Sequence, residues 1–563
     1  MKGGLVAAAL SLCCVLDIAN AFHSSLSSGR QTIGRIRRQQ EARKLAKRDT
    51  DPELLYPTHN FTIPVDHFHN ESQYEPHSNA TYENRYWFDA TYYKPGGPVI
   101  ILQSGEADAS ERLVYLQKGI LHDLAKATNG IGVVFEHRYY GTSFPTPDLT
   151  PENLRFLTTA QALADEAYFA QNIQFPGLEK YGDLTSKSVP YLNYGGSYSG
   201  AISAFLRVQY PDIFWGTISS SGVTKAIYDY WQYYEPIVTY APQDCVAVQK
   251  TLINVVDNIL IGKNSSNLSA ELKSTFGFPN VTYDDDFANI LGFGVGNWQS
   301  LNWDPAVSSP EFYNYCDNIT STQVLYPATE SVRSDAAYLI GQGGYSANTS
   351  LTTQMLNMIG YYNLTEASTC GKTQDECFGT HNYTTYQDYS LSNWNSLSWP
   401  YQYCTEWGYL QTGSGVPSDQ LPIISRLLTL EYESIVCRAA FNITTPPDTE
   451  SVNKYGGYNI SYPRLAIIDG EWDPWRPATP HAFGYGAVNR PSTPSQPFLL
   501  ISEAVHHWDE NGLFFNQTTF DLPPPAVAET QSTEVIFATE WMQEWDMRKV
   551  KTQWKRQDVV RHA

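Results

Sequence analysis

Short apolar runs alternate with stretches of helical periodicity in the first half of the chain. The apolar runs predict buried strands, and the stretches between them, together with the one that follows Ser197, predict helices. Strands and helices that alternate in this way are typical of a mainly parallel sheet. The predicted strands are 98–102, 132–135, 189–194 and 217–219, and the predicted helices are 113–127 and 160–174.

The same pattern returns near the C-terminus, where apolar runs predict strands at 465–468 and 498–501 and a closing helix at 529–547. The region between the two patterned parts is rich in Tyr, Asn and Ser, with patchy helical periodicity at 246–261 and 419–435. Because 563 residues are too many for one core, we expect a core in two segments with an insertion between them. The expected parts are core 49–225 and 441–547, insertion 226–440 and C-terminal tail 548–563.

The first 48 residues predict a leader rather than a folded part. Lys2 precedes an apolar run at 5–16, and the small-residue site Ala19-Asn20-Ala21 follows, which predicts a secretory signal peptide over 1–21. Residues 22–48 are serine-rich and basic and end in Lys47-Arg48, which predicts a propeptide or a disordered basic leader. No later stretch is expected to span a membrane, so we expect no membrane association after signal cleavage.

The net charge limits the class of partner. The whole chain carries −21 at pH 7, and the basic leader contributes about +7 of that, which leaves about −28 for residues 49–563. So large an acidic surplus argues against nucleic acids and anionic membranes as partners. It suits a secreted protein that stays soluble, including in an acidic environment where carboxylates lose charge.

Cysteine usage agrees with secretion. Two of the eight cysteines, Cys13 and Cys14, leave with the signal peptide. An even number remains within the insertion, which predicts disulfides in an oxidising compartment, although their order alone allows about 15 pairings. The spacing matches no zinc site, so we expect neither a metal nor a cofactor. The six remaining cysteines are Cys245, Cys316, Cys370, Cys377, Cys404 and Cys437.

A nucleophile is predicted in the stretch YLNYGGSYSGAISAFLRVQYP at 191–211. A strand, two glycines, Ser197 and a helix follow one another, which is the geometry of a nucleophile elbow. The serine in such an elbow has a strained backbone and needs small neighbours. The usual Gly-x-Ser-x-Gly spacing ends here in Ser199 instead of glycine. We therefore predict Ser197 as the nucleophile, the alternative being a structural glycine-serine loop.

Candidates for the acid and the base follow in the order Ser, Asp, His. The strand at 465–468 breaks into a loop that holds Asp469, Glu471 and Asp473, and the strand at 498–501 ends in a loop with His506 and His507. Both loops follow the carboxyl end of a strand, where open α/β sheets place their sites. Together with Ser197 they predict an α/β-hydrolase core with a catalytic triad.

The oxyanion that forms during acyl transfer needs preorganised donors. The N–H of Tyr198, directly after the nucleophile, is one predicted donor. The second is predicted in the loop after the first strand, at Gly105 or Glu106, and the loop 137–141 is the alternative.

Three side chains are candidates for contact with the substrate. Trp475, two residues after Asp473, would either form one wall of the substrate site or only pack the loop. Glu106 and Asp108 would either receive a substrate amine or lie on a solvated loop.

The chain also resembles a known family. The matching pieces are FEHRYYGTS at 135–143, LTTAQALAD at 157–165, GGSYSG at 195–200, DPW at 473–475 and the histidine pair at 506–507. These motifs are typical of the serine peptidase family of lysosomal Pro-Xaa carboxypeptidase and dipeptidyl peptidase II. IYDYWQYYEPI at 227–237 resembles its secreted fungal prolyl branch. The resemblance covers nearly all of residues 55–545.

The resemblance implies roles and an architecture. It implies Ser197 as nucleophile, Asp473 as acid and His506 as base, with His507 as the alternative because adjacent histidines are easily misaligned. It also implies a mostly helical cap over the active site, cleavage after proline and activity in acid. The pair Cys404–Cys437 is supported by the resemblance, Cys370–Cys377 is favoured by its close spacing, and Cys245–Cys316 completes the expected set.

Secretion makes the N-glycosylation sequons usable. The candidate asparagines are Asn60, Asn70, Asn79, Asn264, Asn267, Asn280, Asn318, Asn348, Asn363, Asn382, Asn442, Asn459 and Asn516.

We therefore expect a secreted serine peptidase that cleaves after proline through a Ser-Asp-His acyl-enzyme, outside the cell or in a lysosome- or vacuole-like compartment. Its expected partners are Pro-containing peptides, and a homodimer is an open alternative. Two other functions fit the same residues, a secreted carboxylesterase or lipase and a non-catalytic α/β-hydrolase binding module. The sequence does not separate exopeptidase from endopeptidase action.

Overall fold

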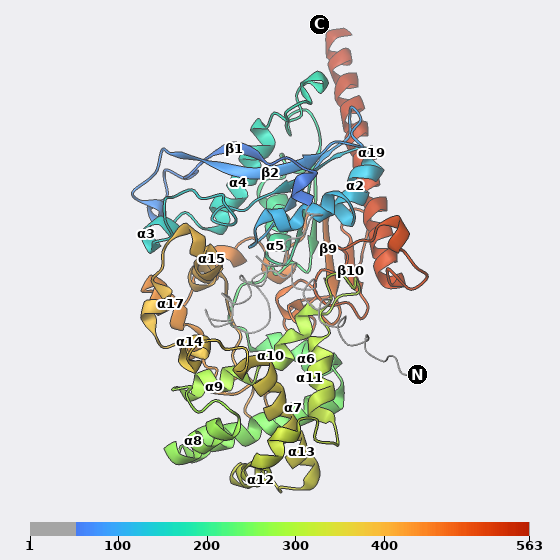
Figure 1. The fold of residues 1–563 in the computed structure, drawn as a ribbon. Coiled ribbons are helices and arrows are strands. Elements are labelled where there is room, and N and C mark those ends of the chain that lie inside the picture. The colour runs from blue at the N-terminus through green and yellow to red at the C-terminus, as the bar shows by residue number, and fades with distance from the viewer. Residues whose placement is uncertain (1–51, 562–563) are drawn as a thin grey trace, which may run out of the picture.

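The computed structural model describes residues 52–561, so the predicted signal peptide and leader lie outside the described residues (Figure 1). An eight-stranded sheet forms the core, in the order β1-β2-β4-β3-β5-β6-β9-β10. The six strands from β4 to β10 in this order are parallel, and β1 and β2 add an antiparallel edge. The strands are β1 His59–Pro64, β2 Thr81–Asp89, β3 Val99–Gln103, β4 Ile131–Phe135, β5 Tyr191–Gly196, β6 Gly216–Ser220, β9 Leu465–Gly470 and β10 Phe498–Ile501.

All six strands that the pattern predicts are present, with ends that differ by at most two residues. The pattern did not predict β1 and β2. Along β2 buried and exposed side chains alternate only in its first half, and its sequence TYENRYWFD is polar enough to resemble a loop. The mainly parallel sheet with helices on both faces confirms the predicted α/β-hydrolase class.

Two helical layers cover the sheet because its strands are apolar on both faces. Val99 and Ile101 of β3 pack with α4 (Thr159–Asn172) and α5 (Tyr198–Gln209) in one core. The alternate residues Ile100 and Leu102 face a second core on the opposite side of the sheet. This period of two along a strand places each apolar residue against one helical layer. The second layer consists of α2 Ile120–Thr128 and the long C-terminal α19 Pro525–Arg561.

The prediction of one helix over 113–127 is wrong. The chain forms a 3₁₀ helix at Ala109–Leu116 and then α2, with a break at Gly119. Gly119 has a φ of +81°, and a Cβ at this position would lie 2.4 Å from the backbone oxygen of Glu510. A continuous helix is excluded because Gly119 has a left-handed backbone conformation, packed closely against the backbone of Glu510. The closing helix, in contrast, is longer than the predicted 529–547.

The long region between β6 and β9 is mostly helical and lies below the sheet in Figure 1. One short parallel pair, β7 (Ile227–Asp229) with β8 (Gly408–Leu410), is its only sheet among the described residues. Its helices are α6 Glu235–Tyr240, α7 Gln243–Asp257, α8 Ser266–Thr275, α9 Asp284–Ile290, α10 Phe293–Gly296, α11 Glu311–Thr320, α12 Arg333–Gln342, α13 Thr349–Tyr362, α14 Gln374–Phe378, α15 Trp394–Gln402, α16 Leu430–Glu433, α17 Ile435–Phe441 and α18 Glu450–Asn453.

Three disulfides connect elements within this helical region. They join Cys245 to Cys316, Cys370 to Cys377 and Cys404 to Cys437, the same pairs as expected. The helical pattern at 246–261 corresponds to α7 and the turn after it, but 419–429 is irregular, so the expected helix at 419–435 is wrong over its first part. Pro422 lies inside that stretch and lacks the N–H that a helix interior needs.

The expectation that no segment passes as a membrane span needs one correction. Within residues 52–561, Gln243–Lys263 is long and apolar enough to cross a membrane by length and composition, and 56% of its apolar window is buried. The stretch includes α7, which Cys245 joins to α11. Burial of this kind is typical of a core helix.

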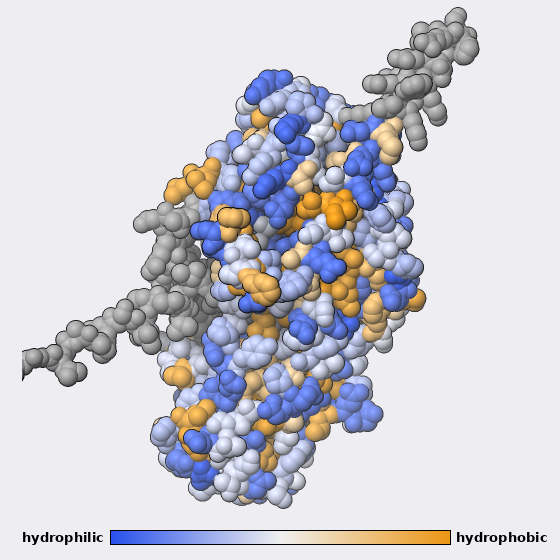
Figure 2. All heavy atoms as spheres, turned by 90° about the vertical axis from the view of Figure 1, so that its right-hand side faces the viewer, coloured by the Kyte–Doolittle hydropathy of each residue, from blue (hydrophilic) through white to orange (hydrophobic). Residues whose placement is uncertain are grey.

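The face that carries α19 is mostly hydrophilic, with separate apolar patches (Figure 2). Among the described residues, two phenylalanines before α19, Phe515 and Phe520, are almost completely exposed.

Candidate active site

The predicted nucleophile lies at the junction of β5 and α5. Ser197 has φ 64° and ψ −127°, a strained conformation that only a rigid surrounding structure maintains. Its backbone N–H donates to Ser220 of the neighbouring β6 at 2.8 Å. A Cβ at Gly195 would lie 2.1 Å from the backbone oxygen of Ser199, so only glycine fits there. Ser199, which replaces the usual glycine, donates from Oγ to the Gly196 oxygen at 2.7 Å.

The predicted acid and base are in contact. Asp473 follows β9 and is completely buried, and its Oδ2 lies 2.8 Å from Nδ1 of His506, which follows β10. The other oxygen, Oδ1, accepts the backbone N–H of Trp475 at 2.8 Å. Both carboxylate oxygens are therefore engaged, and the acid is oriented toward a single imidazole nitrogen.

The histidine loop packs directly against the elbow. The backbone N–H of His507 donates to Ser221 Oγ at 2.9 Å, and a Cβ at Gly196 would lie 3.2 Å from the His507 ring. Ser197 Oγ and His506 Nε2 are both shielded from solvent, and neither has a hydrogen-bond partner in the part of the chain that the structure describes. Buried polar atoms without partners are rare in native proteins and often have a catalytic role.

The two histidines differ in their electrostatic surroundings. Burial lowers the pKa of His506 although Asp473 raises it, and the neighbouring His507 lowers it further. Burial also lowers the pKa of His507, but Glu510 outweighs this effect, and the net direction is upward. His507 Nδ1 lies 2.9 Å from Glu510 Oε2. The imidazole that contacts Asp473 is therefore His506, and His507 has a separate carboxylate.

The two predicted oxyanion donors differ in whether their N–H groups already have an acceptor. The N–H of Tyr198, at the first position of α5, donates to no acceptor among the described residues. Gly105 does approach the elbow, since a Cβ there would lie 3.5 Å from Ser199 Oγ. Its N–H, however, donates to Gln103 Oε1 at 2.6 Å. The Gly105 amide is therefore occupied in this structure, which weighs against it as the second donor.

The Tyr198 side chain belongs to a buried hydrogen-bond network that the sequence pattern does not predict. His137 Nδ1 faces the Arg138 carbonyl at 2.7 Å and therefore donates, so its Nε2 accepts from the Tyr198 hydroxyl at 2.9 Å. Burial lowers the pKa of His137 to about 4, which keeps the ring neutral. Gln402 of α15 donates to the same hydroxyl at 2.8 Å and accepts from Tyr140. The network links the nucleophile helix to the inserted helices.

Two of the motifs that carry the family resemblance meet in space. Arg138 of FEHRYYGTS binds Asp165 of LTTAQALAD through two hydrogen bonds of 2.6 Å. The pair is completely buried. Burial alone would raise the pKa of Asp165, but Arg138 and His67 together lower it to about 2. This ion pair fixes the loop that carries His137.

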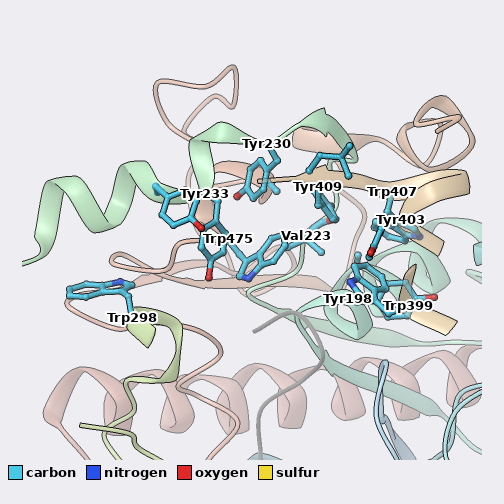
Figure 3. Close-up of a cluster of buried hydrophobic side chains, with 14 of the residues drawn as sticks. Tyr198, Val223, Tyr230, Tyr233, Trp298, Trp399, Tyr403, Trp407, Tyr409 and Trp475 are labelled. Carbon is cyan, nitrogen blue, oxygen red and sulfur yellow. The ribbon is translucent and has the colours of Figure 1, made fainter. Parts of the chain in front are cut away.

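Trp475 lies in an aromatic cluster beside the triad (Figure 3). It stacks on Tyr230 at 5.3 Å, contacts Tyr409 edge-on at 5.1 Å, and its ring centroid is 6.5 Å from that of His506. Figure 3 shows a second group around Tyr198 that contains Trp399, Tyr403 and Trp407, with Tyr409 between the groups. Aromatic rings thus extend from Tyr198, directly after the nucleophile, to Trp475, two residues after the acid.

The acidic candidates near the oxyanion loop are only partly solvated. Glu106 is 2% exposed, which excludes the solvated-loop alternative for this residue. Asp108 is paired with Arg85 at 2.8 Å and accepts the Ser110 N–H at 3.0 Å, so it starts the following 3₁₀ helix. Asp108 therefore has a structural explanation, while Glu106 is a buried carboxyl in the loop after β3.

Two groups of side chains have the composition of metal ligands, and neither contains a triad residue. Their ligand atoms lie within 4.8 Å of one another. In the first, Asp66 Oδ2 is already hydrogen-bonded to His77 at 2.9 Å, and in the second, Asp286 binds Thr380 at 2.6 Å. The groups are Asp66, His69, His77 and Asp285, Asp286, His381.

The sequon asparagines are not equivalent. All thirteen are exposed except Asn318 and Asn363, which are half-buried. Asn318 Nδ2 donates to the Asn314 carbonyl at 2.6 Å, so glycosylation there would break an existing bond.

Comparison with known proteins finds one family whose model matches most of this chain. Residues 64–518 match the family described as serine carboxypeptidase S28. An Arthroderma benhamiae protein named "Probable extracellular serine carboxypeptidase" is 51% identical over 535 residues, 94% of this chain and 74% of that protein. "Serine protease vicPa" of Bipolaris victoriae is 29% identical over 491 residues, 84% of this chain and 88% of that protein. The solved esterase LipW of Mycobacterium marinum superposes with a TM-score of 0.33 and 9% identity over 92% of this chain and 93% of its own, too low to support an argument.

Proposed function

The chain belongs to the serine carboxypeptidase S28 family, and on this basis we propose that it is a secreted serine peptidase that cleaves after proline in an acidic environment. The observation that carries the proposal is the 2.8 Å contact of His506 with Asp473 beside the strained Ser197 elbow. We assign Ser197 as nucleophile, His506 as base and Asp473 as acid.

The first half of the reaction forms an acyl-enzyme. Nε2 of neutral His506 accepts the proton of the Ser197 hydroxyl while Oγ attacks the carbonyl carbon of the scissile bond. Asp473 stabilises the imidazolium that results and keeps Nδ1 as the protonated nitrogen. When the tetrahedral intermediate collapses, the C–N bond breaks and His506 returns the proton to the leaving amine.

The second half regenerates the enzyme. His506, neutral again, takes a proton from a water molecule, whose oxygen attacks the acyl carbon. Collapse of this intermediate breaks the bond to Ser197 Oγ, and the proton on His506 passes to that oxygen. The product acid leaves, and the net reaction is addition of one water across the peptide bond.

The oxyanion formed in both steps needs two donors. We assign one to the N–H of Tyr198. Its position at the start of α5, directly after the nucleophile, supports this assignment. Because the Gly105 amide is occupied by Gln103, we assign the second to the next amide in the same loop, that of Glu106.

The preference for proline is supported by the aromatic cluster. A prolyl ring is apolar and rigid, and aromatic faces give it large contact area at little entropic cost. Trp475 is held by Gln299, which accepts its Nε1–H at 2.9 Å, and by stacking on Tyr230. We propose that Trp475 forms one wall for the prolyl ring, and that residues 226–440 act as a cap over the core segments 49–225 and 441–547.

Secretion is supported by several independent features. A relative in Arthroderma benhamiae is named as extracellular, three disulfides join cysteines of the helical region, and most sequon asparagines are exposed. Asn60, Asn70 and Asn79 are exposed sequons near the start of the core.

The test is an assay of the secreted protein on peptides blocked at the N-terminus. The peptides carry proline, alanine or phenylalanine before the scissile bond, and an acyl ester with the same proline residue is included, with Ser197→Ala as control. We expect hydrolysis of the proline peptide at least about tenfold faster than of the others. Cleavage of the ester with no detectable peptide cleavage would favour the esterase alternative, and no cleavage of either would contradict the enzymatic proposal.

A further inference from the structure

One short segment of the helical region reaches the loops that carry the acid and the base. It comprises residues 298–303, which begin in the 3₁₀ helix Asn297–Ser300. Its two tryptophans are buried, Trp298 completely and Trp303 with 7% exposed. Trp303 packs in the second core of the sheet, and within the described residues no other member of 226–440 belongs to that core. The helical region therefore enters the hydrolase core at this point.

Two hydrogen bonds of the segment go to the loop that follows β9. Trp298 Nε1 donates to the carbonyl of Trp472 at 2.8 Å, and Trp298 lies at one end of the aromatic cluster in Figure 3. Trp475 donates from Nε1 to Gln299 Oε1 at 2.9 Å. Trp475 also donates its backbone N–H to the Asp473 carboxylate at 2.8 Å. The segment thus holds the loop on both sides of the acid.

Two further hydrogen bonds go to the loop that follows β10. Trp508, two residues after His506, donates from Nε1 to the Leu301 carbonyl at 3.0 Å. The carbonyl of Trp508 accepts from Trp303 Nε1 at 2.8 Å. Trp508 is therefore bound to the segment through both its side chain and its backbone.

These four bonds bear on catalysis because of where they lie. Loops beyond strand ends contain peptide groups without a sheet partner, and a buried carbonyl or indole N–H needs one. The two loops also contact each other, through the Trp472 N–H, which donates to the Ala504 carbonyl at 2.8 Å, and through the contact of Asp473 with His506. A segment bonded to both loops fixes the imidazole relative to the carboxylate. A displacement of about 1 Å in such a geometry costs up to about 10²-fold in rate.

We propose that residues 298–303, the tryptophan clasp, position Asp473 and His506 for proton transfer. Trp298 and Trp303 are then positioning residues of the triad, on the acid side and the base side. This inference rests on the proposed triad, and it gives the helical region a part in the chemical step besides covering the site. The alternative is that the segment only anchors the helical region or shapes the substrate site.

The experiment removes single indole N–H groups and measures two reactions. Trp303→Phe removes the donor to Trp508 and keeps an aromatic ring. On a proline peptide we expect kcat to fall about tenfold with KM within about twofold, because Trp475 keeps its bond in the clasp. The reaction with a small fluorophosphonate, in which Ser197 Oγ displaces fluoride from phosphorus, should slow by the same factor, since it needs the triad but no peptide site. Trp298→Phe should act in the same way from the acid side.

The matched control is Trp541→Phe. Trp541 is 1% exposed and donates from Nε1 to the Pro494 carbonyl at 2.9 Å, outside the clasp. The same substitution there should lower the midpoint of thermal unfolding but leave kcat and the phosphonate rate unchanged. Thermal melts identify any variant that fails to fold. Trp508→Phe, which removes the bond to Leu301 from the other side, then gives the test in place of Trp303→Phe.

The two reactions separate this inference from the proposed function. An unchanged phosphonate rate in a folded Trp303→Phe protein, whatever happens to KM, would overturn the positioning role. A loss of equal size in Trp541→Phe would also overturn it, because the effect would then follow from destabilisation alone. If the wild type reacts with the phosphonate, the clasp variants react more slowly and no peptide is cleaved, the clasp is supported and the peptidase proposal fails.

Discussion

The rings of His506 and His507 lie 4.5 Å apart, yet each imidazole binds a different carboxylate. His506 Nδ1 contacts Asp473 at 2.8 Å, across two strand ends, whereas His507 Nδ1 contacts Glu510 at 2.9 Å within its own loop. Adjacent residues in a tight loop point in different directions, and His507 has a positive φ of 38°. Only one of the two can share the carboxylate at the end of β9.

This division predicts unequal effects of two substitutions. His506→Ala should lower kcat/KM by about 10⁴-fold or more, since the triad acts as a unit. His507→Ala should cost about 10- to 100-fold, through loss of its packing on Gly196 and of its pairing with Glu510. Steady-state assays on one proline peptide measure both. The larger loss at His507 would show that the base has been assigned to the wrong residue of the pair.

Ser197 and Ser199 provide a matched test of the nucleophile. Ser197→Ala should abolish hydrolysis while the midpoint of thermal unfolding stays within a few degrees, because Oγ makes no hydrogen bond to described residues. Ser199→Ala removes the bond from Oγ to the Gly196 carbonyl and should lower stability by about 1 kcal/mol with activity retained. The assignment fails if the Ser199 variant is inactive and the Ser197 variant is not.

The acid limb of the pH–rate profile should lie below the ordinary range of a histidine. The base must be neutral, and burial lowers the pKa of His506 despite the opposing effect of Asp473, so the neutral form persists into mild acid. A profile of kcat/KM from pH 4 to 8 locates the limb.

The neighbour of His506 provides the control for this profile. His507→Gln removes a positive charge that lowers the pKa of His506, so the limb should move to higher pH. A wild-type limb above neutrality would contradict the prediction of acid activity, and an unmoved limb in His507→Gln would contradict the proposed electrostatic coupling.

Stability should fall as the pH rises from mild acid to neutrality. Burial raises the pKa of Glu166 to about 8, although its Oε2 accepts the Asn193 amide at 2.6 Å. The folded chain therefore keeps this proton while the unfolded chain releases it above about pH 4.5. The contribution of Glu166 to the free energy of unfolding is fully present below about pH 4.5. It is lost at about 1.4 kcal/mol per pH unit as the pH rises toward 8. Burial also raises the pKa of Asp509 to about 6, which acts in the same direction.

Glu166→Gln tests this mechanism because the amide oxygen can still accept from Asn193. Denaturant unfolding between pH 5 and 8 should show a smaller loss of stability with pH in the variant than in the wild type. Asp148→Asn serves as a control, since hydrogen bonds from Thr150 lower the pKa of that half-buried carboxyl and its linkage lies at lower pH. Parallel curves for Glu166→Gln and wild type would exclude Glu166 as the source of the slope.

The sequence predicts the features that depend on residues close together in the chain. The parallel strands are continuous apolar runs, and the elbow at Ser197 combines a strand, glycines and a helix within one short stretch. β2 was not predicted because it is a half-exposed strand with a polar sequence.

The features that escaped prediction depend on residues distant in the chain. The break at Gly119 arises because Glu510 lies against it. The hydroxyl of Tyr198 joins His137 and Gln402, which no local spacing connects, and Gly105 gave no sign that Gln103 would occupy its amide.

The adjacency of β6 and β9 has a consequence for how the enzyme is made. Thr217 pairs with Leu465 in neighbouring strands although the whole helical region separates them in the chain. Parallel pairing across so long a connection is slow, because the loop must close before the contact is gained. On the ribosome, the strand of Ser197 is complete long before the strands that end at Asp473 and His506 have been synthesised. A nascent or truncated chain therefore carries a nucleophile without a base, and hydrolytic activity arises only when the last strands dock.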